Sequence, residues 1–197
     1  FPEAMTLLAE KAGVVIAPHA GLSPEKARQK RGLYEVLTWV AGQYHRCLLH
    51  APEAKEARDY LTGRGITPES NKQFQLGYAP ESWDWIQQQA RRDGIGLAQL
   101  EEAGVIALGR QGNRYYDRFR GRVLFSIRDA QGRTVGFGGR IMPGPAAEQA
   151  AKYINSPETP LFSKHKLLYG LDQARDAISR SRTALVVEGY TDCLIGH

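Results

Sequence analysis

Two carboxylates near the end of the chain have the residue type and spacing of metal ligands. Glu188 and Asp192 lie four residues apart, directly after the apolar run at residues 184–187. Four apolar residues followed by an acid and a glycine predict a buried strand, of the kind that pairs in parallel, with its carboxyl end at Glu188. Carboxylates at such strand ends can hold Mg²⁺ together with water and substrate phosphates. The alternative is an ordinary acid at a helix N-terminus and a solvated Asp192.

A group of arginines upstream has the type expected of phosphate ligands. If residues 116–125 form one extended strand, alternation places Arg118, Arg120 and Arg122 on one face and apolar side chains on the other. Such a strand would rest on a core and present a row of cations. Arg140 follows two glycines, whose missing side chains would let a backbone come close to the partner of this arginine. The alternative is that the two glycines mark the end of a tight hairpin.

The positive charge of the chain is concentrated in this same region. Of the net charge of +5, residues 110–140 contribute +6, from eight arginines and two aspartates with no lysine. Residues 1–109 have a net charge of −1, and residues 141–197 are neutral. Because the planar guanidinium suits phosphate, this indicates binding to a nucleic acid or nucleotide. A solvated face is the alternative, but it normally mixes signs and uses lysine freely.

Further cations accompany the last third of the chain. Lys152 and Tyr153 pair a cation with a stackable ring, which suits a single-stranded nucleic acid. The alternative is an exposed lysine beside a buried tyrosine. Lys164 adds positive charge before the last predicted strand.

Composition limits the class of protein. A hydrophobic content of 42% over 197 residues supports a packed core, and no apolar stretch approaches the roughly 20 residues of a membrane span. The chain starts at Phe1 with neither an initiator Met nor a signal peptide, so we expect a piece of a longer protein. Cys47 and Cys193 have no partner at metal-ligand spacing, which fits a reducing compartment and no zinc site within this chain.

Periodicity predicts an α+β fold, with a helical N-terminal part followed by a mixed or antiparallel sheet subdomain. Turn signals predict a turn at residues 77–80, and apolar spacing predicts a largely helical stretch at residues 161–181. Other helices are expected at residues 33–49, 52–61, 82–92 and 97–103, and strands at 105–108, 115–116, 122–128 and 134–137.

These residues in their order resemble the bacterial-type DNA primases, the DnaG-type enzymes that make RNA primers. Shorter matches lie at residues 57–61, 64–65, 77–80, 83–84, 122–123, 127–129, 152–153 and 168–171. The longer motifs are Tyr116-Asp117-Arg118-Phe119-Arg120, Gly136-Phe137-Gly138-Gly139-Arg140, Asn155-Ser156-Pro157-Glu158-Thr159 and Val187-Glu188-Gly189-Tyr190-Thr191-Asp192.

The resemblance implies a domain organisation. Residues 1–31 would be a helix and linker from an absent zinc-binding domain, and residues 32–165 the N-terminal subdomain of the polymerase core. Residues 166–197 would begin a truncated topoisomerase-primase (Toprim) subdomain, so the chain would end in the first strand of that α/β fold. A domain that contacts the replicative helicase would follow further on.

The resemblance also implies roles for individual residues. Glu188 and Asp192 would bind the catalytic Mg²⁺ or Mn²⁺ together with a later Asp-x-Asp motif, which is absent because the chain ends at His197. Lys152 and Lys164 would be catalytic-centre cations. The ridge that guides template and nucleotide phosphates would comprise Arg118, Arg120, Arg122, Arg140, Lys152 and Tyr153.

The implied function is DNA-directed RNA synthesis of short primers on single-stranded DNA, from ribonucleoside triphosphates. The protein would act in the cytoplasm, at the nucleoid and replication fork, without a membrane partner. The chain alone would bind DNA but be inactive as a polymerase. Two alternatives are a non-catalytic single-stranded-DNA-binding module and another Toprim protein, a nuclease or topoisomerase.

Overall fold

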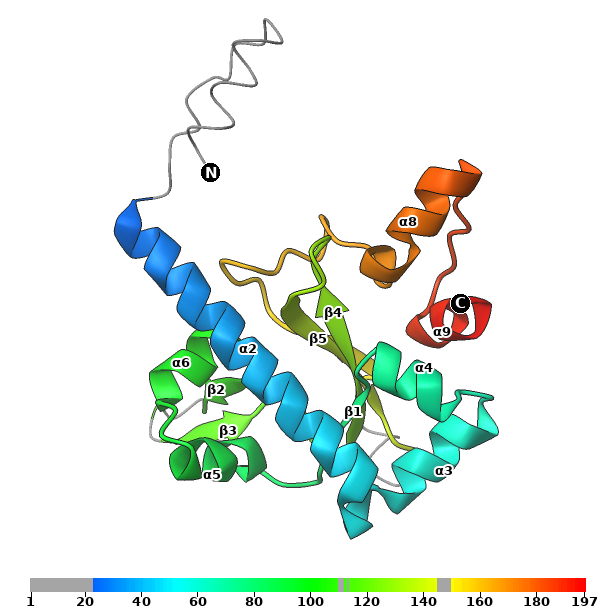
Figure 1. Ribbon diagram of the computed structural model, residues 1–197. Helices are drawn as coiled ribbons and strands as arrows, with labels where there is room; N and C mark the ends of the chain where they lie inside the picture. The colour runs from blue at the N-terminus through cyan, green and yellow to red at the C-terminus, as the bar shows by residue number, and fades with distance from the viewer. Residues whose placement is uncertain (1–22, 110–111, 113, 145–149) are drawn as a thin grey trace, which may run out of the picture.

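The computed structural model describes residues 23–109, 112, 114–144 and 150–197 (Figure 1). Most of the predicted helix and linker at residues 1–31 lies outside the described residues, as do Arg110 and residues 145–149. Within the described ranges, no helix is long and apolar enough to cross a membrane.

Helices dominate the first half of the described chain, and strands follow. The helical elements are α2 (Pro24–His50), the short 3-10 helix η1 (Pro52–Ala54), α3 (Lys55–Gly63), α4 (Pro68–Gln73), α5 (Trp85–Arg92), α6 (Leu97–Glu102), α8 (Leu171–Ser181) and α9 (Tyr190–Gly196). The strands are β1 (Gly77–Ala79), β2 (Ile106–Leu108), β3 (Tyr115–Asp117), β4 (Arg122–Arg128), β5 (Thr134–Ile141) and β6 (Tyr153–Asn155). Because α2 runs unbroken through residue 31, the boundary expected there falls inside a helix, and the three-part division stays a prediction.

The long helix α2 organises the core. Ser23 caps it by accepting a hydrogen bond from the Lys26 amide at 3.4 Å, and an apolar stripe from Leu33 to Leu48 is buried along its length. α2 contacts β1 and β5 on one side and α5 and α6 on the other, and Figure 1 shows it between these two groups. Gly77 in β1 permits this packing, because a side chain there would lie 2.7 Å from Tyr44 Cβ.

The main sheet has the order β1-β4-β5-β6, with every neighbouring pair antiparallel, and β2 and β3 form a separate hairpin. The sequence prediction of an α+β fold with an antiparallel sheet after a helical part is confirmed. The predicted turn at residues 77–80 is wrong for its first three residues, which are strand β1. The backbone of β1 pairs with the first residues of β4, and a pairing between segments so far apart in the sequence cannot be predicted from a local turn signal.

The prediction of one continuous strand at residues 116–125 is wrong. β3 ends at Asp117 and β4 begins at Arg122, because the chain turns at Gly121, whose φ of +56° favours glycine. β4 is also buried on both of its faces, so alternation along it does not separate a cationic face from an apolar one.

The last segment differs most from the prediction. Residues 183–187 form no strand, and Leu185 and Val186 are 83% and 75% exposed, so the predicted buried first Toprim strand is wrong for this chain. A strand needs a neighbour for its backbone N–H and C=O groups, and no described segment pairs with this one. The predicted helix at residues 161–181 is likewise shorter, since α8 begins only after Gly170, whose φ is +77°.

One aromatic ring nevertheless attaches this segment to the sheet. Tyr190 stacks on Phe125, with ring centroids 4.9 Å apart, and donates a hydrogen bond to Asn155 Oδ1 at 2.7 Å. Burial raises the pKa of Tyr190 to about 12. Its ring occupies the space that a side chain on Gly138 would need. Gly138 therefore serves this docking, and the role of the two glycines in letting a backbone approach the partner of Arg140 stays a prediction.

We predict that Gly138→Ala displaces Tyr190 and loosens α9. The added methyl group would overlap the ring, and such overpacking typically costs about 1–3 kcal/mol. Hydrogen exchange of the Cys193 amide, which is bonded to the Gly189 carbonyl at 3.1 Å, should become faster. The matched control is Gly32→Ala in α2, where a methyl group meets nothing within 4 Å. Equal exchange rates in the two variants would contradict this docking.

Candidate nucleic-acid and metal site

Arg118, Arg120 and Arg122 meet at one cavity of about 490 Å³. The turn at Gly121 brings them together: Arg118 and Arg120 come from the link between β3 and β4, and Arg122 is the first residue of β4. We call this cavity the arginine groove. The cavity is also lined by Glu81, Tyr116, Ile141, Ala150, Ile154 and Asn155. The predicted grouping of the three cations is thus present in space, although its predicted cause, strand alternation, is wrong.

Arg122 is a structural brace within the groove. Its side chain is buried, and its guanidinium donates hydrogen bonds to the backbone carbonyls of Gly139 at 3.2 Å, Ala151 at 3.0 Å and Lys152 at 3.4 Å. Burial lowers its pKa, and the charge of Arg120 acts in the same direction. Arg122 therefore ties the segment that leads into β6 to the main sheet, and most of its donors are used internally.

Arg118 and Arg120 are both half-buried and keep donors free. Arg118 Nε donates to the Ile106 carbonyl at 3.3 Å, while Arg120 Nη1 donates to the Asp117 carbonyl. The Arg120 guanidinium lies 4.0 Å from the centre of the Trp83 ring. Each guanidinium has five N–H donors, of which one bonds to another described residue, so both side chains are positioned while remaining able to bind an anion.

Arg140 is held between aromatic rings on the neighbouring strand and helix. Its guanidinium lies 4.4 Å from the Tyr60 ring centre and 5.9 Å from that of Tyr153, which is its partner in the β5–β6 register. Its Nη1 atom is buried and has no hydrogen-bond partner among the described residues. A buried cationic N–H without an acceptor is costly, so an acceptor in addition to the described residues would stabilise it. Sequence reasoning missed Tyr60, because nothing local connects α3 with β5.

Ion pairing divides the arginines of residues 114–140 into two groups. Arg114, Arg128 and Arg133 each lie within 4.0 Å of an aspartate oxygen. Within the described part of the chain, none of the three groove arginines or Arg140 forms such a pair. Among the arginines of residues 114–140, those without an ion pair are therefore located at the groove, which Glu81 also lines, and beside Tyr60.

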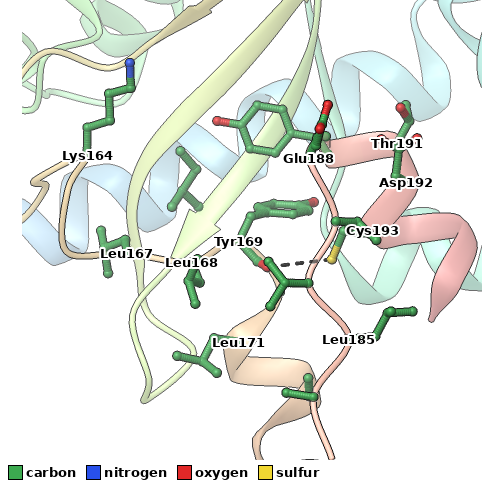
Figure 2. A pocket seen from close by; sticks show the side chains of 18 of the residues that line it. Lys164, Leu167, Leu168, Tyr169, Leu171, Leu185, Glu188, Thr191, Asp192 and Cys193 are labelled. Atoms are coloured by element: carbon green, nitrogen blue, oxygen red, sulfur yellow. Dashed lines mark hydrogen bonds between the residues drawn. The ribbon is translucent and has the colours of Figure 1, made fainter.

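The two candidate carboxylates lie at a second cavity, of about 680 Å³. Glu188 and Asp192 are both exposed and flank the start of α9, as Figure 2 shows. Gly189 between them carries no side chain, and any Cβ there would come within 2.8 Å of Asp192 Oδ2. The carboxylate oxygens are the donor type that Mg²⁺ prefers. Across the described ranges, no third His, Cys, Asp or Glu joins them.

Strand β6 separates the two cavities. Asn155 lines both of them, whereas Tyr153 and Lys164 line the carboxylate cavity. Lys164 is exposed, and its backbone amide donates to Glu158 Oε1 at 3.0 Å, which lowers the pKa of that carboxyl. Lys152 is exposed and lines neither cavity. The groove, Tyr153 and the carboxylates therefore follow one another around a single edge of the sheet.

A family model, described as the N-terminal domain of the DNA primase catalytic core, matches residues 44–175. The chain belongs to the DNA primase family. The DNA primase of Deinococcus radiodurans is 45% identical over 197 residues, which are all of this chain and 32% of that protein. The DNA primase of Halalkalibacterium halodurans is 38% identical over 194 residues, 98% of this chain and 32% of that relative. The chain thus spans about a third of these relatives.

Solved primase structures share the fold. The RNA polymerase domain of Mycobacterium tuberculosis primase DnaG, in complex with a double-stranded DNA carrying a 6-nucleotide overhang, has a TM-score of 0.77 and 38% identity. The match covers 83% of this chain and 50% of that one. A DnaG primase catalytic domain bound to single-stranded DNA has a TM-score of 0.74 and 38% identity, over 85% and 50% of the two chains. The predicted family and fold class are confirmed.

The brace formed by Arg122 leads to a stability prediction. Arg122→Met keeps an unbranched apolar side chain at this position but removes the guanidinium and its three bonds to carbonyls, so we expect the free energy of unfolding to fall by about 1–3 kcal/mol. Arg118→Met, which removes one bond of 3.3 Å, should cost less than about 1 kcal/mol. Urea denaturation followed by circular dichroism measures both. Equal losses would show that Arg122 is not a brace.

Proposed function

We propose that this chain is the template- and nucleotide-binding part of a DNA primase, a DNA-directed RNA polymerase that makes short RNA primers on single-stranded DNA. The observation that carries the proposal is the division of the arginines. Those at the groove and Arg140 are positioned by carbonyls and rings and lack carboxylate partners among the described residues, whereas their neighbours outside it are paired. Preorganised and uncompensated cations are what a phosphate backbone requires.

The residues divide the work by their positions. Arg118 and Arg120 would hold phosphates of the template, and Arg122 would position the groove as well as add charge. Arg140, with its partnerless Nη1 atom, would bind a phosphate of the incoming ribonucleoside triphosphate. Lys152 and Lys164 would add charge near the reacting groups, and Tyr153, which is 39% exposed, would stack on a base.

Glu188 and Asp192 would hold Mg²⁺ or Mn²⁺ between them. The bound metal would stabilise the charge that develops on the attacking and leaving oxygens during phosphoryl transfer. Two carboxylates are an incomplete ligand set, so the chain by itself should not polymerise nucleotides. In this proposal, further ligands come from elsewhere in a longer protein, and zinc belongs only to an upstream domain.

The relatives support the DNA-binding part of this proposal, since their names include a primase catalytic domain bound to single-stranded DNA. Action in the cytoplasm at the replication fork and contact with a replicative helicase outside this chain stay predictions. A non-catalytic single-strand-binding module is the rival function, and it requires no metal. Membership of the primase family favours the enzyme, and argues against an unrelated Toprim nuclease or topoisomerase.

We predict that Arg118→Gln combined with Arg120→Gln weakens binding of this chain to single-stranded DNA and reduces its salt dependence. Loss of two phosphate contacts should reduce the slope of log K against log salt concentration by about 1–2. Fluorescence anisotropy with a labelled oligothymidine at several salt concentrations measures this. Arg128→Gln combined with Arg133→Gln removes the same charge from paired positions and is the control. Similar slopes for the two double variants would show that Arg118 and Arg120 do not bind phosphates of the DNA.

We also predict that Mn²⁺ binds at Glu188 and Asp192. Paramagnetic broadening of backbone amide signals in this chain should be strongest at Thr191 and Asp192, and Mg²⁺ should reverse it by competition. Glu188→Gln combined with Asp192→Asn should abolish the broadening, whereas Asp176→Asn on α8 should not. Broadening that persists in the double variant would place the metal elsewhere.

A further inference from the structure

One carboxylate lies among the cations of the arginine groove and has no role so far. Glu81 lines the same cavity as the three groove arginines, Arg118, Arg120 and Arg122. Its carboxylate occupies the position that a side chain on Gly121 would take, at the turn that brings these arginines together. Position 121 therefore needs glycine for a second reason besides its φ of +56°, since a side chain there would displace Glu81. A negative charge is thus built into the wall of a cationic cavity.

The backbone on either side of Glu81 is held at this turn. Ala79, the last residue of β1, pairs with the first residue of β4. The carbonyl of Pro80 accepts hydrogen bonds from the Gly121 amide at 3.2 Å and from the Ser82 amide at 2.8 Å. The link between β1 and α5 is therefore tied to the link between β3 and β4. Although Glu81 is exposed, its backbone keeps the carboxylate beside the groove.

Glu81 acts on the groove without forming an ion pair in it. Among the described residues, no Lys, Arg or His nitrogen lies within 4.0 Å of its oxygens. Its charge nevertheless reaches Arg122: burial and the charge of Arg120 lower the pKa of Arg122, and the charge of Glu81 opposes them. Because water screens an exposed carboxylate, Glu81 reduces the positive potential of the groove without cancelling it. The groove arginines thus stay available to an anion.

We propose that Glu81 is a built-in competitor of phosphate, which limits how tightly the groove holds a single strand. This inference rests on the proposed function, because it needs strand phosphates on Arg118 and Arg120. In the free chain, the carboxylate offsets the mutual repulsion of the groove arginines. When a strand enters, the same carboxylate repels its phosphates. Glu81 therefore stabilises the free chain and weakens the complex.

A limited affinity suits a strand that is being copied. Such a strand must advance through the groove, and phosphate contacts position it without recognising its bases. A carboxylate among these contacts shortens the time for which the strand stays bound, because its repulsion acts on the bound state. A carboxylate elsewhere on the surface contributes the same charge but acts mainly on the rate of association. That difference provides a matched control.

The test compares Glu81→Gln with Glu35→Gln, a change at an exposed position on α2 that lines neither cavity. Both variants lose one negative charge. At low salt, Glu81→Gln should bind a labelled oligothymidine about threefold to tenfold more tightly, mainly through slower dissociation in stopped-flow anisotropy. Its melting temperature without DNA should fall by about 1–3 °C. Both differences should shrink as salt is added, and Glu35→Gln should leave the dissociation rate and the melting temperature nearly unchanged.

The outcomes separate this inference from the proposed function. If the wild-type chain does not bind the oligothymidine, the proposed function fails first. If it binds and Glu81→Gln dissociates no more slowly than Glu35→Gln, the groove stands and the competitor is overturned. Weaker binding by Glu81→Gln would also overturn it, because the carboxylate would then be accepting a hydrogen bond from the strand. Tighter binding without a lower melting temperature would overturn the stabilising role of Glu81 in the free chain.

A further variant locates the effect. When Arg118→Gln and Arg120→Gln are already present, adding Glu81→Gln should no longer increase the affinity much, because the phosphates that Glu81 repels are no longer held beside it. An undiminished gain in that background would place the repulsion outside the groove and overturn the inference. Circular dichroism of each variant verifies that an altered affinity does not come from unfolding.

Discussion

The antiparallel pairing of β4 with β5 is the constraint on which the rest of the site depends. Its register places Val123 opposite Arg140 and Arg122 opposite Ile141, at the end of the sheet where the groove lies. β5 then pairs with β6 so that Arg140 faces Tyr153 and Gly138 faces Asn155. A shift of one residue in this pairing would move every one of these side chains to the opposite face. The groove, the position of Arg140 and the docking of Tyr190 therefore share one structural cause.

The same sheet explains why charge alone is a poor guide to the role of each arginine. Arg122 carries the same charge as its neighbours, yet its burial and its three carbonyl acceptors make it a brace. Arg128 at the other end of β4 lies 3.5 Å from an Asp172 oxygen and is compensated. Arg118, Arg120 and Arg140 contact carbonyls or rings and have no carboxylate oxygen within 4.0 Å among the described residues, so they can still attract an anion. Whether an arginine can bind an anion therefore depends on the groups that it already contacts. The pairing of the strands determines which groups these are.

Local patterns predicted much of the fold and less of the site. The limits of β4 at residues 122–128 and the apolar stripe of α2 were predicted, because each depends on residues close in sequence. The grouping of Arg118, Arg120 and Arg122 was predicted for the wrong reason, since a left-handed glycine at position 121 replaces a continuous strand. Tyr60 and Trp83 were missed because their contacts with Arg140 and Arg120 join segments far apart in sequence. No local periodicity in the sequence predicts which aromatic ring contacts which cation.

The carboxylates follow a segment that would need a neighbouring strand, and the described residues do not supply one. Residues 183–187 have the composition of a buried strand, yet they lie unpaired with Leu185 exposed. Glu188 and Asp192 are held near β6 chiefly because Tyr190 inserts against Gly138 and Phe125. The arginine groove, in contrast, is built on a sheet that is already complete. In the proposed function, phosphate binding should thus be a property of this chain on its own, whereas a full metal site would need ligands in addition to Glu188 and Asp192.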